Sequence, residues 1–145
     1  MPAIYEQHGL RFAYPENWQL QEPDEDADLI DVTLQTPAGG FWSVQLMPAG
    51  CSPAECIQEV VNEIEGEYEG VEKEPQEFDF GSESADGFEL RFFCLDMLVE
   101  ARVWAMRLEQ GTLICHYQAE QTEYAAIAPV FQAIATSLFQ PDFGN

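Results

Sequence analysis

The chain has 145 residues, of which 27 are Asp or Glu and 5 are Lys or Arg, so its formal net charge at pH 7 is −22. Its hydrophobic share of 46% is that of a globular protein, and its length suits a single domain over residues 1–145. Nucleic-acid binding depends on clustered Lys and Arg, and anionic membranes repel acidic proteins, so we expect neither partner. The first residues form no export signal, and no apolar run is long enough to span a membrane. These features predict a cytoplasmic protein.

Four short strands are expected in the first third of the chain. Residues 10–14 alternate between apolar and polar, and a Pro-Glu-Asn turn separates them from a short strand that begins at Trp18. Residues 29–36 alternate again. The turn at residues 37–40 is so short that residues 41–47 should return as the antiparallel partner of that strand.

The clearest local pattern is a helix over residues 52–68. Ser52, Pro53 and Glu55 suit the N-cap, the first helical position and a capping-box partner. The apolar residues that follow fall on one face of a helix: Ile57, Val60, Val61, Ile64 and Tyr68.

The second half of the chain should supply the rest of a sheet. Residues 71–80 suit an edge strand that is broken at Pro75, because proline cannot donate a ladder hydrogen bond. Residues 82–87 are expected to form a loop. Residues 88–95 and 98–108 are apolar on both faces, which is typical of strands that are covered on both sides.

A further strand over residues 113–118 completes the sheet. A hairpin loop at Gln110 and Gly111 would place only apolar residues opposite one another. The predicted pairs are Leu108 with Leu113, Met106 with Cys115, and Trp104 with Tyr117.

The chain should end in a second helix over residues 122–139, capped by Thr122 and kinked or restarted at Pro129. The order of elements predicts an α+β protein. We expect a three-layer α/β/α sandwich of about six mainly antiparallel strands, with one helix on each face.

Residues 9–18, the Ser52-capped helix and residues 124–131 together resemble the PsbP-like sandwich family, which includes the Ran-binding Mog-type and bacterial DcrB-like proteins. The likeness lies in the order of elements and a few turn residues. It implies binding, docking or chaperone roles rather than catalysis. No motif matches a family binding site position by position, so no functional residue is carried over.

Acidic residues gather in two segments of the sequence, at 22–31 and 63–79. We expect this acidic surface to dock a basic protein partner, although a solvated surface or a saline habitat would also explain the charge. The residues predicted to bind the partner are Asp24, Glu25, Asp26, Asp28, Asp31, Glu63 and Glu67.

The alternative hypothesis is a small enzyme or ligand-binding protein that uses cations. Arg91, Arg102 and Arg107 lie on predicted strands and suggest an anion site. The simpler interpretation is that these arginines pair with Glu89 and Glu100 on neighbouring strands.

The cysteines and histidines do not have the spacing of a metal site. Cys51 and Cys56 are five residues apart, Cys94 stands alone, and Cys115 and His116 should point to opposite faces of a strand. We therefore expect free thiols, and we predict no cofactor, no metal and no catalytic residue.

Overall fold

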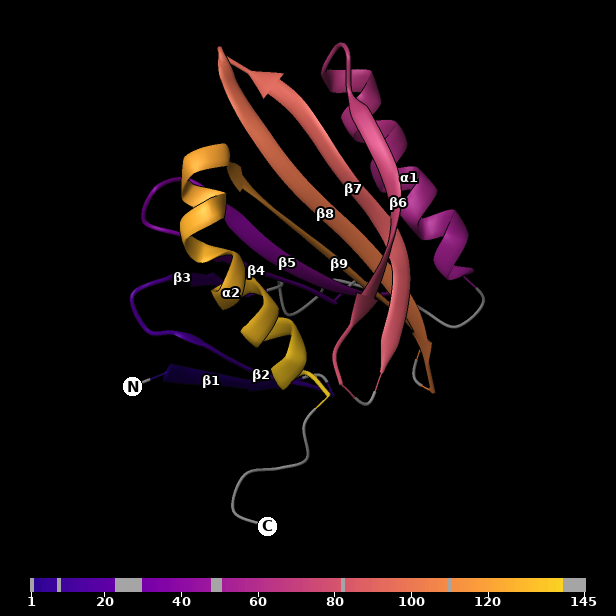
Figure 1. The fold of residues 1–145 in the computed structure, drawn as a ribbon. Coiled ribbons are helices and arrows are strands. Elements are labelled where there is room, and N and C mark those ends of the chain that lie inside the picture. Colours follow the sequence, from indigo (N-terminus) through magenta and orange to yellow (C-terminus); the bar gives the residue numbers. More distant parts are fainter. Residues whose placement is uncertain are drawn as a thin grey trace.

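A computed structural model describes residues 2–7, 9–22, 30–47, 51–81, 83–109 and 111–139 (Figure 1). Over these residues the chain forms nine strands and two helices. In chain order they are β1 (Pro2–Gln7), β2 (Leu10–Pro15), β3 (Gln19–Gln21), β4 (Ile30–Gln35), β5 (Phe41–Met47), α1 (Pro53–Glu67), β6 (Glu72–Asp79), β7 (Ser84–Cys94), β8 (Met97–Leu108), β9 (Gly111–Glu120) and α2 (Gln121–Ser137).

The main sheet has seven described strands in the order β3-β4-β5-β9-β8-β7-β6, and every neighbouring pair is antiparallel. The predicted α+β class and the antiparallel sheet are thereby confirmed, with seven strands rather than about six. None of the described helices is long and apolar enough to cross a bilayer.

A separate ribbon of β1 and β2 was not anticipated. Residues 10–14 form a strand as predicted, but they pair with β1, for which no strand was predicted. The ribbon is held by aromatic contacts: Tyr5 stacks on Phe12 with ring centroids 5.2 Å apart, and Phe12 meets Trp42 of β5 edge-on at 5.0 Å. The ribbon therefore covers part of the sheet beside α2.

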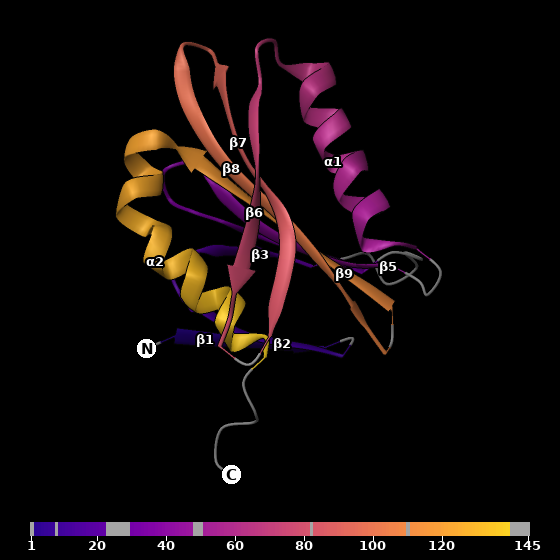
Figure 2. The same cartoon turned by 45° about the vertical axis from the view of Figure 1, so that its right-hand side comes forward.

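The two helices contact opposite faces of the main sheet (Figures 1 and 2). On β8, Val103 packs in the cluster that contains buried residues of α1, whereas the adjacent Trp104 packs in the cluster that contains Phe131 of α2. Successive residues of a strand point to opposite faces, so β8 is apolar on both sides because each side is covered.

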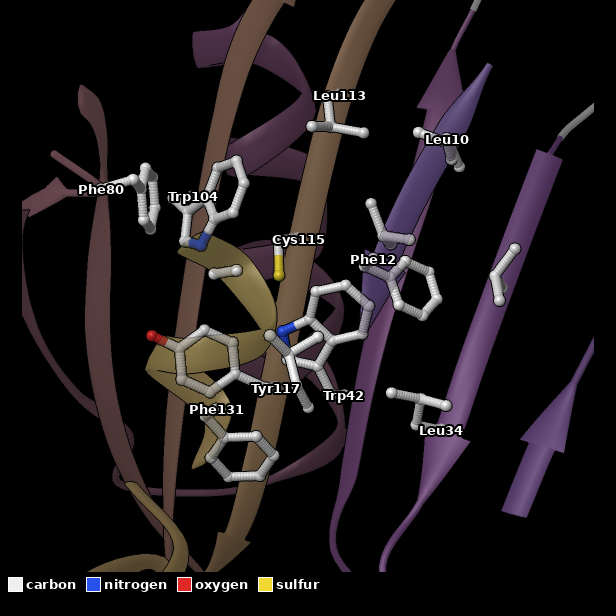
Figure 3. Packing of buried hydrophobic residues seen from close by; sticks show 14 of the residues in the cluster. Leu10, Phe12, Leu34, Trp42, Phe80, Trp104, Leu113, Cys115, Tyr117 and Phe131 are labelled. Atoms are coloured by element: carbon white, nitrogen blue, oxygen red, sulfur yellow. The ribbon is translucent and has the colours of Figure 1, made fainter. Parts of the chain in front are cut away.

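The larger core lies between the sheet, the ribbon and α2 (Figure 3). Trp42 and Trp104 have no exposed surface, and the side chain of Cys115 lies between them. Phe131 of α2 closes this core with its ring centroid 4.9 Å from that of Tyr117. Aromatic side chains thus supply much of the apolar area that holds α2 to the sheet.

Of the two predicted helix N-caps, the structure confirms one. Ser52 caps α1 as predicted, and its side chain accepts a hydrogen bond from the backbone N–H of Glu55. The predicted cap of α2 was wrong: Glu120, not Thr122, is the N-cap, and its carboxylate accepts the Thr122 N–H. Pro129 lies within α2.

The predicted register of β8 and β9 was wrong by two residues. Leu108 pairs with Gly111 rather than with Leu113, so Met106 faces Leu113 and Trp104 faces Cys115. A shift of two residues leaves every side chain on the same face of the sheet. The apolar pattern is therefore satisfied equally well by both registers, and it could not distinguish them.

Two boundaries in the β6–β7 region also differ from expectation. Pro75 does not break β6 but pairs with Phe88, because β6 is an edge strand whose outer side needs no ladder donor. Residues 84–87, expected as a loop, begin β7. Gly87 faces Trp104 in the ladder with β8.

The β7–β8 hairpin ends in a finger that extends beyond its neighbours. β6 pairs with β7 only as far as Arg91, and β9 pairs with β8 only from Val99 onward. Leu95 and Asp96 form the turn with positive φ of 50° and 69°. The large exposed apolar residues of this finger are Phe93, Leu95 and Met97.

Candidate functional site

A groove of about 630 Å³ lies between α1 and the outer face of β4, β5 and β9. It forms because α1 packs mainly on β8 and β9 and leaves the outer face of β4 and β5 open. Its volume lies within the range of ligand-binding sites in proteins. We call it the acid-rimmed groove, for the side chains that form its wall.

Glu59, Glu63 and Glu67 form the rim of this groove. They are exposed and stand four residues apart on α1, so they line up along one side of the helix. Val60 and Ile64 of the same helix line the groove with less exposed, apolar side chains.

The floor of the acid-rimmed groove is mostly polar. One cross-strand row is formed by Thr33, Ser43 and His116, which are paired across β4, β5 and β9. A neighbouring row joins Gln35, Phe41 and Gln118. These side chains point away from the aromatic core, because the residues that alternate with them face α2.

Asp31 lies in the next row, opposite Gln45. Its carboxylate accepts hydrogen bonds from the Gln45 amide at 3.1 Å, the Ser43 hydroxyl at 3.2 Å and the Thr33 hydroxyl at 3.4 Å. Asp31 does not itself line the groove, but its carboxylate is held by three side chains of the groove floor.

His116 lies half-buried in the floor. Its Nε2 is 2.9 Å from Oε1 of Gln118, and its ring meets that of Phe41 edge-on with centroids 5.0 Å apart. Burial lowers the pKa of His116 to about 4, although the hydrogen bond to Gln118 acts in the opposite direction. The imidazole is therefore neutral at pH 7 and places no cation in the acid-rimmed groove.

The structure brings together two of the residues predicted to bind a partner, Glu63 and Glu67, which line one groove. Asp31 does not line it but is hydrogen-bonded to three residues that do. Asp24, Glu25, Asp26 and Asp28 lie outside the described residues. Sequence reasoning missed Glu59 and the polar floor. The four-residue spacing of Glu59, Glu63 and Glu67 was a visible signal for the rim, whereas no local pattern indicated that three strands would face it.

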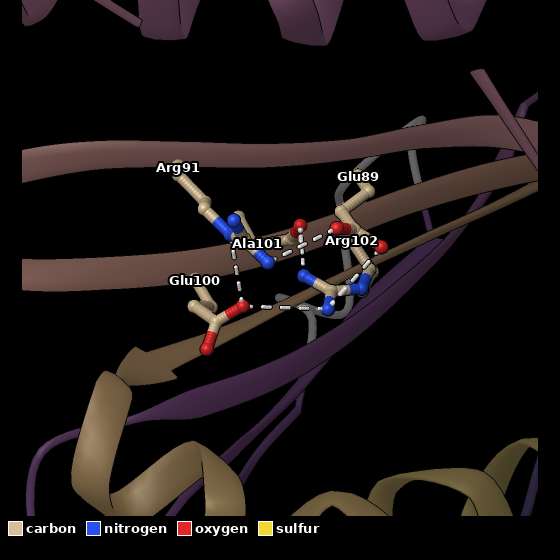
Figure 4. A network of polar contacts seen from close by, with 5 residues as sticks. All are labelled: Glu89, Arg91, Glu100, Ala101 and Arg102. Atoms are coloured by element: carbon tan, nitrogen blue, oxygen red, sulfur yellow. Dashed lines mark hydrogen bonds and ion pairs between the residues drawn. The ribbon is translucent and has the colours of Figure 1, made fainter. Parts of the chain in front are cut away.

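The alternative anion site is built differently. Arg91 and Arg102 lie side by side on β7 and β8, where each contacts two glutamates (Figure 4). Arg91 lies 3.5 Å from Glu89 and 3.3 Å from Glu100, and Arg102 lies 3.5 Å from both. The simpler interpretation, pairing with these two glutamates, is therefore confirmed for Arg91 and Arg102 but not for Arg107.

Arg102 is buried, and its remaining contacts are also structural. It donates a hydrogen bond to the carbonyl of Ala101, and its guanidinium lies 4.6 Å from the ring centroid of Tyr124 on α2. Arg107 is exposed at the other end of β8 and points to the opposite face. The three arginines thus do not form one site, and two of them are already matched by carboxylates.

The cysteines and other potential metal ligands do not gather. Among the described residues there is no group of three or more His, Cys, Asp or Glu that could hold a metal ion. Cys51 and Cys56 contact each other at the start of α1, and burial raises the pKa of the Cys56 thiol. Burial also raises the pKa of Cys115 well above its usual value, which opposes a role for this thiol as a nucleophile.

Comparison with known proteins gives the fold. No protein-family model matches the chain, and no curated protein matches it. The solution structure of cyanobacterial PsbP from Synechocystis is similar over 94% of this chain and 90% of its own, with a TM-score of 0.60 and 15% identity. Protein PA94 of Pseudomonas aeruginosa, of unknown function, is similar over 97% of this chain and 98% of its own, at a TM-score of 0.56 and 13% identity.

A protein of Bacteroides thetaiotaomicron has a TM-score of 0.63 and 12% identity. The chain spans about half of that protein, since the likeness covers 98% of this chain and 49% of the other. The resemblance to PsbP-like proteins is therefore confirmed for the fold.

Proposed function

We propose that this domain is a cytoplasmic, non-catalytic binding or adaptor protein that docks a basic protein partner in the acid-rimmed groove. One observation carries the proposal: three glutamates of α1 line up over a polar floor in a groove large enough for a ligand. Of the described residues that line this groove, none is Lys or Arg. Its negative charge is thus available to a partner.

Four of the five cations in the described chain pair with glutamates outside the groove. Lys73 lies 3.2 Å from Glu65, and Arg11 lies 2.8 Å from Glu6, while Arg91 and Arg102 contact Glu89 and Glu100. Glu59, Glu63 and Glu67 appear in none of these pairs. A net charge of −22 adds a long-range field that accelerates encounter with a basic partner.

The acidic segment before β4 belongs to the proposal on sequence grounds. Asp24, Glu25, Asp26 and Asp28 directly precede the strand that carries Asp31. We expect them to extend the negative surface that a basic partner meets. Reversal of Asp24, Asp26 and Asp28 to Lys should weaken capture without unfolding the domain.

The test is affinity capture from an extract of the host organism with three proteins. The first is the native chain, and the second carries Glu59→Gln, Glu63→Gln and Glu67→Gln. The third is a control of equal net charge with Glu69→Gln, Glu72→Gln and Glu74→Gln, all exposed and outside the groove. A basic partner should bind the native and control proteins, be lost from the groove variant, and be released as salt rises.

Equal capture by all three proteins, or capture that withstands about 0.5 M salt, would contradict the proposal. In that case the acidic groove would be a solvated surface only. Because all the substituted glutamates are exposed, the variants should remain folded, which circular dichroism would verify.

A further inference from the structure

We infer, on the basis of the proposed function, that the occupant of the acid-rimmed groove is an extended segment with Lys or Arg at alternate positions. The groove would thus select the spacing of the basic residues along the partner as well as their charge. The inference combines the spacing of the rim with the chemistry of the floor.

The spacing of the rim matches an extended chain. A helix rises 1.5 Å per residue, so Glu59, Glu63 and Glu67 succeed one another about every 6 Å along α1. An extended chain rises about 3.3 Å per residue, so every second side chain on one face is about 6.6 Å from the next. Three alternate basic residues can therefore face the three glutamates at once.

The floor favours an extended chain over a helix. Thr33 and Ser43 donate their hydroxyl protons to Asp31, and Oε1 of Gln118 is bonded to His116, so the hydroxyl oxygens can still accept and the Gln118 amide NH₂ can still donate. An extended segment has unpaired backbone N–H and C=O groups that need such partners. A helical segment satisfies its backbone internally and would leave this remaining capacity of the floor unused.

The apolar side chains of the groove suit basic residues in particular. Val60 and Ile64 of α1 and Met47 of β5 also line the groove. Lys and Arg bury their aliphatic stems against apolar surface while their charged ends remain at a polar rim. Each basic residue of the segment would thus contact apolar side chains through its stem and a carboxylate through its charged end.

Two blocked heptapeptides of identical composition test this inference by fluorescence anisotropy. Each has three lysines and four serines, with the lysines at positions 2, 4 and 6 in one and at positions 1, 4 and 7 in the other. The second peptide can present only one lysine at a time to the row of glutamates, because its lysines on one face are about 20 Å apart. The first peptide should bind about fivefold more tightly, which corresponds to the loss of two exposed ion pairs.

The protein variants separate this inference from the proposed function. The variant with Glu59→Gln, Glu63→Gln and Glu67→Gln should lose the preference and most of the binding, whereas the Glu69→Gln, Glu72→Gln and Glu74→Gln control should keep both. If both peptides bind the native protein equally and lose affinity only in the groove variant, the alternating-segment inference is wrong and the proposed function stands.

Two other results are decisive. If neither peptide binds, or if both bind the groove variant as well as the native protein, both proposals are overturned. Spermine, a cation without a peptide backbone, serves as a further probe. Tighter binding of spermine than of the alternating peptide would show that the floor does not recognise a backbone, and would overturn the inference alone.

Discussion

The carboxylate of Glu123 on α2 accepts a hydrogen bond of 2.5 Å from the hydroxyl of Thr36, although 87 residues separate them in the chain. The same hydroxyl accepts the N–H of Gly40 at 2.8 Å, so it joins the turn between β4 and β5 to the first turn of α2. Thr36 is buried, and these two bonds account for its position. The start of α2 is thereby fixed to the end of β4.

Thr36→Val should remove both bonds while keeping the shape of the side chain. The expected loss in the free energy of unfolding is about 1–3 kcal/mol, because the Glu123 carboxylate is left without its donor. Urea denaturation measures it. Thr33→Val on the same strand is the control: its hydroxyl makes only longer contacts of 3.3 and 3.4 Å, so its effect should stay below about 0.5 kcal/mol. Equal losses would show that the bond to Glu123 contributes nothing.

Gly87→Ala should destabilise the protein severely. A Cβ at this position would lie 1.8 Å from the carbonyl oxygen of Val103 and 2.8 Å from the Cα of Trp104. Both are backbone atoms, so β7 and β8 would have to separate, at about 3 kcal/mol or more. Gly66→Ala in exposed α1 meets no atom within 4 Å and should instead stabilise by up to about 1 kcal/mol. Thermal melts of both variants measure these changes in stability. A small loss of stability in Gly87→Ala would contradict the close approach of β7 and β8.

Leu95→Asn should raise the melting temperature. Leu95 has a φ of 50° in a two-residue hairpin turn, where Asn is favoured and a bulky side chain is strained. Its side chain is 89% exposed, so the substitution sacrifices little packing. We expect a gain of about 0.5–1 kcal/mol. Met97→Thr, which removes exposed apolar surface without a change of turn residue, should leave stability within about 0.5 kcal/mol. A loss of stability in Leu95→Asn would mean that the leucine makes a compensating contact.

The native chain should lose stability in mild acid through His116. Its folded pKa of about 4 lies below the usual value of 6.5, so below pH 6.5 the unfolded chain binds a proton that the folded chain does not. The stability that the neutral His116 contributes is fully present above pH 6.5 and is lost as the pH falls to about 4. Between pH 7 and 4.5, His116→Gln should lose about 1–2 kcal/mol less than the native protein, after allowance for partial exposure of the ring. If urea unfolding showed the same loss of stability for the native protein and His116→Gln over this pH range, the lowered pKa of His116 would be contradicted.

Salt should stabilise the protein. The chain carries 27 acidic and 5 basic residues, so charge repulsion within the folded state is large. The melting temperature should rise between dilute buffer and about 0.5 M sodium chloride, as the Debye length falls to about 4 Å. Scanning calorimetry measures this, and a flat or falling curve would show that the carboxylates are already neutralised.

Local signals predicted the elements well and their pairing less well. The Ser52 cap and the apolar stripe defined α1 because both depend on neighbouring residues. β1 escaped detection because Ile4 is exposed and Tyr5 is its only fully buried residue, so no alternation marks it. The β8–β9 register failed because a two-residue shift preserves the face of every side chain.

The candidate site was predicted only in part for a similar reason. The row of glutamates on α1 could be read from a four-residue spacing. The floor combines β4, β5 and β9, and β5 is separated from β9 by all of α1 and three strands. Only the folded chain brings Thr33, Ser43 and His116 into one row.

The edge strand β6 gives part of the acidity a role that needs no partner. An open sheet edge is a template for pairing with another molecule, and long apolar edges nucleate fibrils. β6 instead carries Glu72, Glu74 and Glu77 beside Pro75. Two such edges brought together would align carboxylates along their whole length, and the proline would leave a gap in the ladder. The protein should therefore resist fibril formation at high concentration even when the glutamates of its groove are neutralised.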